Sequence, residues 1–247
     1  MIQPTEDAIK TLIELYQSGN LDEAEAKANE LLKDSPNEVT ILNILGVIQD
    51  GKGQSDKAIQ TYTKALQIND KSPETHFNMG SVFHKIAKNK DARTCYEKAI
   101  NLKPDFVNAY FNLALVCQNL QDYESAEKNY QKTIDLQPNF HEAIGSLGTL
   151  MQAQGRLEEA IDNYQKAISI QPDARNYFNL AAGLRTKGSL DEAIEYFEKS
   201  LSINNNDPNV LTSLGDALWH KGDTKAAFEK LNQAIEIDPD NPMANYN

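Results

Sequence analysis

The sequence is poor in cysteine and has no long apolar run. Only two cysteines occur among 247 residues, Cys95 and Cys117, and their spacing matches no metal-binding or redox motif. No apolar run approaches the roughly 18 residues that a membrane-spanning helix needs, and residues 1–10 lack the basic and apolar blocks of a signal peptide. We therefore expect a cytoplasmic protein whose two cysteines are buried packing residues.

Positive charge is also scarce. The chain has 24 lysines and arginines against 36 aspartates and glutamates, which gives a net charge of −12. Nucleic acids and anionic membrane surfaces are themselves negative, so they repel a chain of this charge. We expect a protein or an extended peptide as the partner, with no nucleic acid and no membrane.

Motifs that carry catalysis are missing as well. The sequence contains no glycine-rich phosphate loop, no paired metal ligands and no nucleophile elbow. Adjacent carboxylates such as Glu158 and Glu159 are explained by the preference of helix N-termini for negative charge. We predict that the chain is not an enzyme, with no catalytic residues, no metal site and no cofactor.

What the sequence does contain is a repeated stretch. Residues 110–114 (YFNLA) recur letter for letter at residues 177–181 and more loosely at residues 76–80. A small residue then recurs at intervals of 34 residues, once 33, at Ala24, Ala58, Ala92, Ala126, Ala160, Ala193 and Ala227. A period of this length indicates an array of stacked repeats, in which each repeat contacts its neighbours, and not a single core.

This period divides the chain into seven repeats within one solenoid domain, residues 1–247. The repeats are residues 5–38, 39–72, 73–106, 107–140, 141–173, 174–207 and 208–241, and residues 242–247 are the start of an eighth. Each contains two segments with apolar residues at helical spacing. Glycine separates the two segments in five repeats, and we expect slightly different turns where Ala87 and Gln121 replace it.

The pattern of each repeat resembles the tetratricopeptide repeat (TPR). The shared features are Leu-Gly or Leu-Ala in the first segment, glycine at the break, alanine, an aromatic residue and alanine in the second segment, and a closing proline. The resemblance covers residues 5–241. It implies an all-α fold, a right-handed superhelical solenoid of antiparallel helix pairs, and a role in protein binding on the concave side.

A helical wheel divides the first helix of each repeat into two strips, numbered from the first residue of the repeat. Positions 4, 7, 8 and 11 collect apolar and small residues and are predicted to be core. Positions 2, 5, 6, 9, 12 and 13 are polar, rich in amides and nearly balanced in charge. We call this second set the ligand strip, because the resemblance implies that it lines the concave side and binds the partner.

Candidate binding residues lie on the ligand strip. Position 6 carries asparagines, whose carboxamides can both donate hydrogen bonds to peptide groups and accept them, and position 5 carries phenylalanines that offer apolar contact. Arg175 and Arg185 could hold an acidic side chain of the ligand. The predicted peptide-binding residues are Phe77, Asn78, Phe111, Asn112, Ser146, Arg175, Phe178, Asn179, Arg185 and Ser213.

Packing remains an alternative role for these residues. The asparagines could bond to neighbouring helices, the phenylalanines could pack between repeats, and Trp219 could be either a partner contact or a residue at the edge of the core. The asparagine series resembles that of the superhelical repeat region of O-GlcNAc transferase, which implies an extended polypeptide as ligand. Ser146 and Ser213 interrupt the series.

These observations favour a non-catalytic protein–protein interaction scaffold that binds an extended peptide segment of its partner in a concave groove. The alternative is a substrate-recognition arm of a larger modifying enzyme, for example a glycosyltransferase, whose catalytic domain lies beyond the C-terminus. Self-association through the C-terminal end of the solenoid is a further possibility, because the ends of solenoids need a polar cap.

Overall fold

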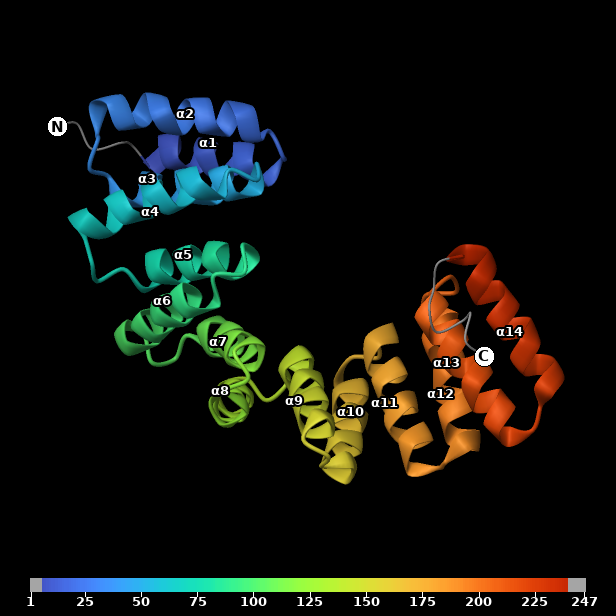
Figure 1. Ribbon diagram of the computed structural model, residues 1–247. Helices are drawn as coiled ribbons and strands as arrows, with labels where there is room; N and C mark the ends of the chain where they lie inside the picture. The colour runs from blue at the N-terminus through green and yellow to red at the C-terminus, as the bar shows by residue number, and fades with distance from the viewer. Residues whose placement is uncertain (1–5, 240–247) are drawn as a thin grey trace. The chain divides into compact units, whose positions relative to one another are not determined.

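A computed structural model describes residues 6–239, which form fourteen helices and no strand (Figure 1). The first helices of the repeats are α1 (Glu6–Gln17), α3 (Val39–Gly51), α5 (Pro73–Lys85), α7 (Val107–Asn119), α9 (His141–Ala153), α11 (Ala174–Lys187) and α13 (Pro208–Lys221). The second helices are α2 (Leu21–Asp34), α4 (Ser55–Ile68), α6 (Asn89–Leu102), α8 (Tyr123–Leu136), α10 (Leu157–Ile170), α12 (Leu190–Ile203) and α14 (Thr224–Ile237).

Two of the predicted boundaries fall on residues that the structure does not describe. The start of an eighth repeat, residues 242–247, lies outside the described range, and so does Thr5, the expected first residue of repeat one. Within the described range, no helix is long and apolar enough to cross a bilayer.

The helices pack as consecutive pairs. Within each part, α5 packs most extensively on α6 and α13 on α14, and a second helix then packs on the next first helix, as α6 does on α7 and α12 on α13. Short turns between the two helices make antiparallel neighbours. The prediction of an all-α fold made of stacked helix pairs is confirmed.

The chain divides into two compact parts. Residues 1–132 contain α1 to α7 and most of α8, and residues 133–247 contain the end of α8 and α9 to α14. The same core contacts recur inside each part, as the sequence period requires.

The core of each repeat is built on the recurring alanine of the second helix. All seven of these alanines have no exposed surface. One turn later, in repeats two to seven, comes a large residue that fills the space between the two helices, whereas repeat one has Ala28 there and buries Leu12 of its first helix. In repeats two to six this residue is among the largest fully buried side chains of the described chain: Tyr62, Tyr96, Tyr130, Tyr164 and Phe197.

The large residue requires a small partner on the first helix. A Cβ atom added to Gly148 would lie 2.8 Å from the ring of Tyr164 and 3.1 Å from the backbone oxygen of Ala160, and one added to Gly46 would lie even closer to the ring of Tyr62. Such distances leave no room for a larger side chain at these glycines. The two helices therefore approach closely at position 8, which belongs to the strip predicted to be core.

The turns of repeats three and four have the hydrogen bonds of the turn in repeat two and differ from the glycine turns only by a smaller positive φ. Ala87 (φ 59°) and Gln121 (φ 61°) adopt the left-handed conformation that Gly53 (φ 74°) adopts in repeat two. The Ala87 N–H donates to the His84 carbonyl, as the Gly53 N–H donates to the Asp50 carbonyl. Packing of the helix pair imposes the left-handed conformation at this position. Ala87 and Gln121 adopt it although it is strained for a residue with a Cβ atom.

Both cysteines are buried, as predicted. Cys95 has 8% of its surface exposed and Cys117 has 1%, and neither forms a disulfide. Burial raises the pKa of each thiol to about 11, since an apolar environment disfavours the thiolate. They act as small apolar side chains in the core.

Enlarging Ala160 to leucine should destabilise the chain by about 1–3 kcal/mol, because the site is fully buried and closely packed. Thermal unfolding of Ala160→Leu measures the effect. Ala153→Leu is the control, since Ala153 is exposed at the end of α9. A melting temperature of Ala160→Leu equal to that of the parent chain would contradict close packing at this site.

Replacing Ala87 with glycine should stabilise the chain by about 1 kcal/mol, because glycine adopts the left-handed conformation without a clash of its Cβ atom. Gln121→Gly should behave in the same way. Urea unfolding measures both, and Gly53→Ala, which introduces the same strain, should have the opposite sign. If Ala87→Gly lowers stability, the turn is not strained.

Candidate functional site

The ligand strips of neighbouring first helices lie side by side. In the first part of the chain, Lys85 of α5 forms an ion pair with Asp50 of α3 at 3.0 Å. The His84 ring nitrogen Nε2 of α5 lies 3.2 Å from the amide nitrogen of Asn119 in α7. All four residues occupy positions 12 or 13, so these contacts join the strips of three consecutive repeats into one surface.

The asparagines at position 6 differ in their surroundings. Asn78 is half-buried, and its amide has no hydrogen-bond partner among residues 6–239. The Asn179 amide lies 3.5 Å from the Thr149 hydroxyl, which is long for a hydrogen bond. Burial raises the pKa of Tyr96, and hydrogen bonds with Ser81 and Asn112 oppose that effect. Asn78 is therefore the most available of the three amides.

The phenylalanines at position 5 pack against buried aromatic residues of their own repeat. The ring of Phe77 lies 5.7 Å from that of Tyr96, centroid to centroid. Phe111 and Phe178 make the same contact with the aromatic residues of their second helices. All three remain half-buried, not fully buried. Phe77 also packs against the ring of Phe106, with centroids 4.8 Å apart. The part of each ring that stays accessible offers an apolar surface on the ligand strip.

The two arginines of repeat six are not equivalent. Arg185 forms an ion pair with Asp216 of α13, and Asp216 also lies 3.3 Å from the ring of His220. Arg175 is exposed at the start of α11 and has no ion pair within residues 6–239. Of the expected pair, Arg175 alone has its charge free for a ligand.

The serines that interrupt the asparagine series also differ. Ser146 is half-buried, whereas Ser213 has only 8% of its surface exposed. Repeat five also lacks a phenylalanine at position 5, where it has Gly145. The side-chain oxygen of Asn176 occupies the space that a side chain at this glycine would need.

Trp219 is exposed and is not a core residue. Half of its surface is accessible, and its ring packs edge-on against the equally exposed Phe228, with centroids 5.9 Å apart. The two residues form an aromatic pair on α13 and α14.

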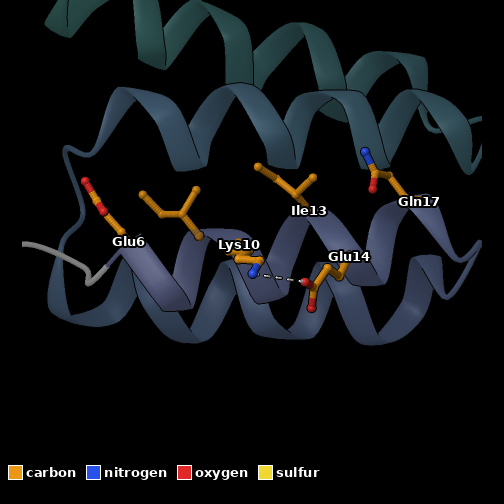
Figure 2. Close-up of a pocket in the computed structure, with 6 residues that line it drawn as sticks. Glu6, Lys10, Ile13, Glu14 and Gln17 are labelled. Carbon is orange, nitrogen blue, oxygen red and sulfur yellow. Dashed lines mark ion pairs between the residues drawn. The ribbon is translucent and has the colours of Figure 1, made fainter.

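The predicted binding residues include none from repeat one, although the ligand strip of this repeat lines a pocket. The strip residues of α1 line a shallow pocket of about 350 Å³ together with Glu14 (Figure 2); they are Glu6, Ile9, Lys10, Ile13 and Gln17. Lys10 and Glu14 form an ion pair at 4.0 Å. The helical wheel indicates these residues, because they occupy positions 2, 5, 6, 9 and 13 of repeat one.

A second pocket lies on the ligand strip in the other part of the chain. It has a volume of about 280 Å³ and is formed by α11, α12, α13 and the residue before α13. Of the predicted residues it brings together Arg175 and Phe178. The remaining lining residues are Ala174, Ser200, Asp207, Asn209 and Val210.

Comparison with known families agrees with this architecture. A family model described as the C-terminal domain of cilia and flagella-associated protein 70, a TPR domain, matches residues 7–244. The chain belongs to this TPR family. No curated protein matches the chain.

Solved TPR structures share the fold. A chain of the APC/C hetero-tetramer Cut9-Hcn1 has a TM-score of 0.76 at 20% identity, over 98% of this chain and 48% of that one. A TPR protein from Parabacteroides merdae has a TM-score of 0.73 at 20% identity, over 98% and 96% of the two chains.

A third structure, YrrB, is described as a TPR protein with an unusual peptide-binding site. It has a TM-score of 0.62 at 22% identity, over 76% of this chain and 97% of that one. At these identities the similarity shows the fold alone. The chain also spans only about half the length of the Cut9-Hcn1 chain that it matches.

Proposed function

We propose that this TPR chain is a non-catalytic interaction scaffold, which binds an extended segment of a partner protein on its ligand strip. The observation that carries the proposal is the free amide of Asn78 beside the half-buried ring of Phe77. This amide is in contact with water and has no protein partner among the described residues, so a ligand can bond to it without breaking a contact within the protein.

The chemistry of the strip suits the backbone of an extended chain. A carboxamide donates to a peptide carbonyl and accepts from a peptide N–H, so it binds the backbone without selecting a side chain. The ring edges of Phe77, Phe111 and Phe178 add apolar contact. Because the charges on the strip nearly cancel, it suits a segment that is close to neutral.

The contacts within the strip can be exchanged for contacts with a ligand. The bond between Asn179 and Thr149 is long at 3.5 Å, so a peptide group can replace it at little cost. Arg185 is neutralised by Asp216 and holds two first helices together, which gives it a structural role. Membership of the TPR family and the description of YrrB also support peptide binding.

The test removes three amides from the strip in one variant, Asn78→Ala with Asn112→Ala and Asn179→Ala. Each hydrogen bond contributes about 0.5–1.5 kcal/mol, so the affinity for a peptide selected from a random library should fall at least about tenfold. Isothermal titration calorimetry measures the affinity.

The control variant changes three exposed asparagines that are off the strip, Asn101→Ala, Asn139→Ala and Asn232→Ala. It should bind as the parent chain does, and the melting temperatures of both variants confirm that they are folded. Undiminished affinity in the strip variant would rule out backbone capture by these amides.

A further inference from the structure

The pocket beside Arg175 contains both engaged and free polar groups. The Ser200 hydroxyl donates to the Ala174 carbonyl at 2.8 Å. The Asp207 carboxylate accepts the backbone N–H groups of Asn209 at 3.0 Å and Val210 at 3.4 Å, and thereby caps α13. The side chains of Arg175 and Asn209 have no partner among the described residues.

These two free side chains occupy equivalent places. Arg175 is the second residue of α11 and Asn209 is the second residue of α13, so both stand at the first turns of neighbouring first helices. A guanidinium and a carboxamide both present N–H donors. Together they offer a cation and a neutral donor at the rim of one pocket.

The rest of the pocket provides an apolar surface. Phe178 is half-buried with its ring 5.8 Å from that of Phe197, centroid to centroid, and Val210 has 4% of its surface exposed. An apolar side chain placed here would be removed from water, which is favourable. The pocket thus combines an apolar wall with donors at its rim.

The negative charge of Asp207 does not cancel that of Arg175. The two groups form no ion pair, and the Asp207 carboxylate is directed at the N–H groups of the first turn of α13. The positive end of that helix offsets its charge. The other arginine of α11, Arg185, differs because Asp216 neutralises it directly.

We propose that this pocket selects a carboxylate that adjoins an apolar side chain in the bound segment. The inference rests on the proposed function and adds to it the chemistry of one side of the ligand. Arg175 binds the carboxylate through its fork of N–H groups, Asn209 adds a further donor, and Phe178 and Val210 contact the apolar side chain. The carboxylate comes either from an aspartate or glutamate within the segment or from the C-terminus of the partner.

The experiment starts from peptides selected on the parent chain from a random library. Each peptide is then made in three forms: with all carboxylates, with its acidic side chains changed to amides, and with an amidated C-terminus. Loss of the relevant carboxylate should weaken binding to the parent chain about tenfold, as expected for a charged hydrogen-bond partner. The form that loses affinity identifies the source of the carboxylate.

Variants assign the effect to the pocket. With Arg175→Gln, the acid and amide forms should bind equally. A repeated selection on Arg175→Glu should enrich lysine or arginine in place of acidic residues. Lys225→Gln is the matched control, because it removes one exposed, unpaired positive charge on α14, and it should retain the tenfold difference.

The outcomes separate this inference from the proposed function. Selected peptides whose affinity does not depend on any carboxylate would overturn the inference and leave peptide binding intact. A carboxylate effect that persists in Arg175→Gln would also overturn it. Failure to select any peptide on the folded chain would contradict the proposed function and this inference together.

Discussion

The structure depends on one contact, which recurs in repeats two to seven: a large residue of the second helix packs against a small residue in the first helix of the same repeat. Tyr164 against Gly148 is one example, in which a single added carbon would clash. This contact sets the distance and the rotation of the two helices. Because the chain repeats it, the same orientation of the first helix recurs along each part.

The rotation of the first helix decides which residues are left for a partner. With positions 4, 7, 8 and 11 turned to the core, positions 2, 5, 6, 9, 12 and 13 form the ligand strip. Ion pairs such as that of Lys85 with Asp50 then join the strips of neighbouring repeats. Under the proposed function, stability and binding belong to separate faces of one helix, and Phe77 contributes to both, because its ring packs on the core and stays partly accessible.

Most of the fold could be predicted from the sequence, since the core contacts are local and recur at a fixed period. The details of the candidate site could not. Arg185 pairs with Asp216, which lies 31 residues later in the sequence. A helical wheel has no information on such neighbours, nor on the burial of Ser213 or the lack of a partner at Asn78 within residues 6–239. At Ala87 the difference from the glycine turns is small, because helix packing overrides the local preference for glycine.

The central claim is that side-chain amides of the ligand strip bind the backbone of a partner. Nuclear magnetic resonance of the nitrogen-15-labelled chain tests it directly, by following side-chain amide signals while a selected peptide is added. The account predicts that the Asn78 signal shifts with the saturation of binding, while those of Asn101 and Asn232 on second helices stay in place. Shifts confined to the second-helix asparagines, with Asn78 unchanged, would contradict it.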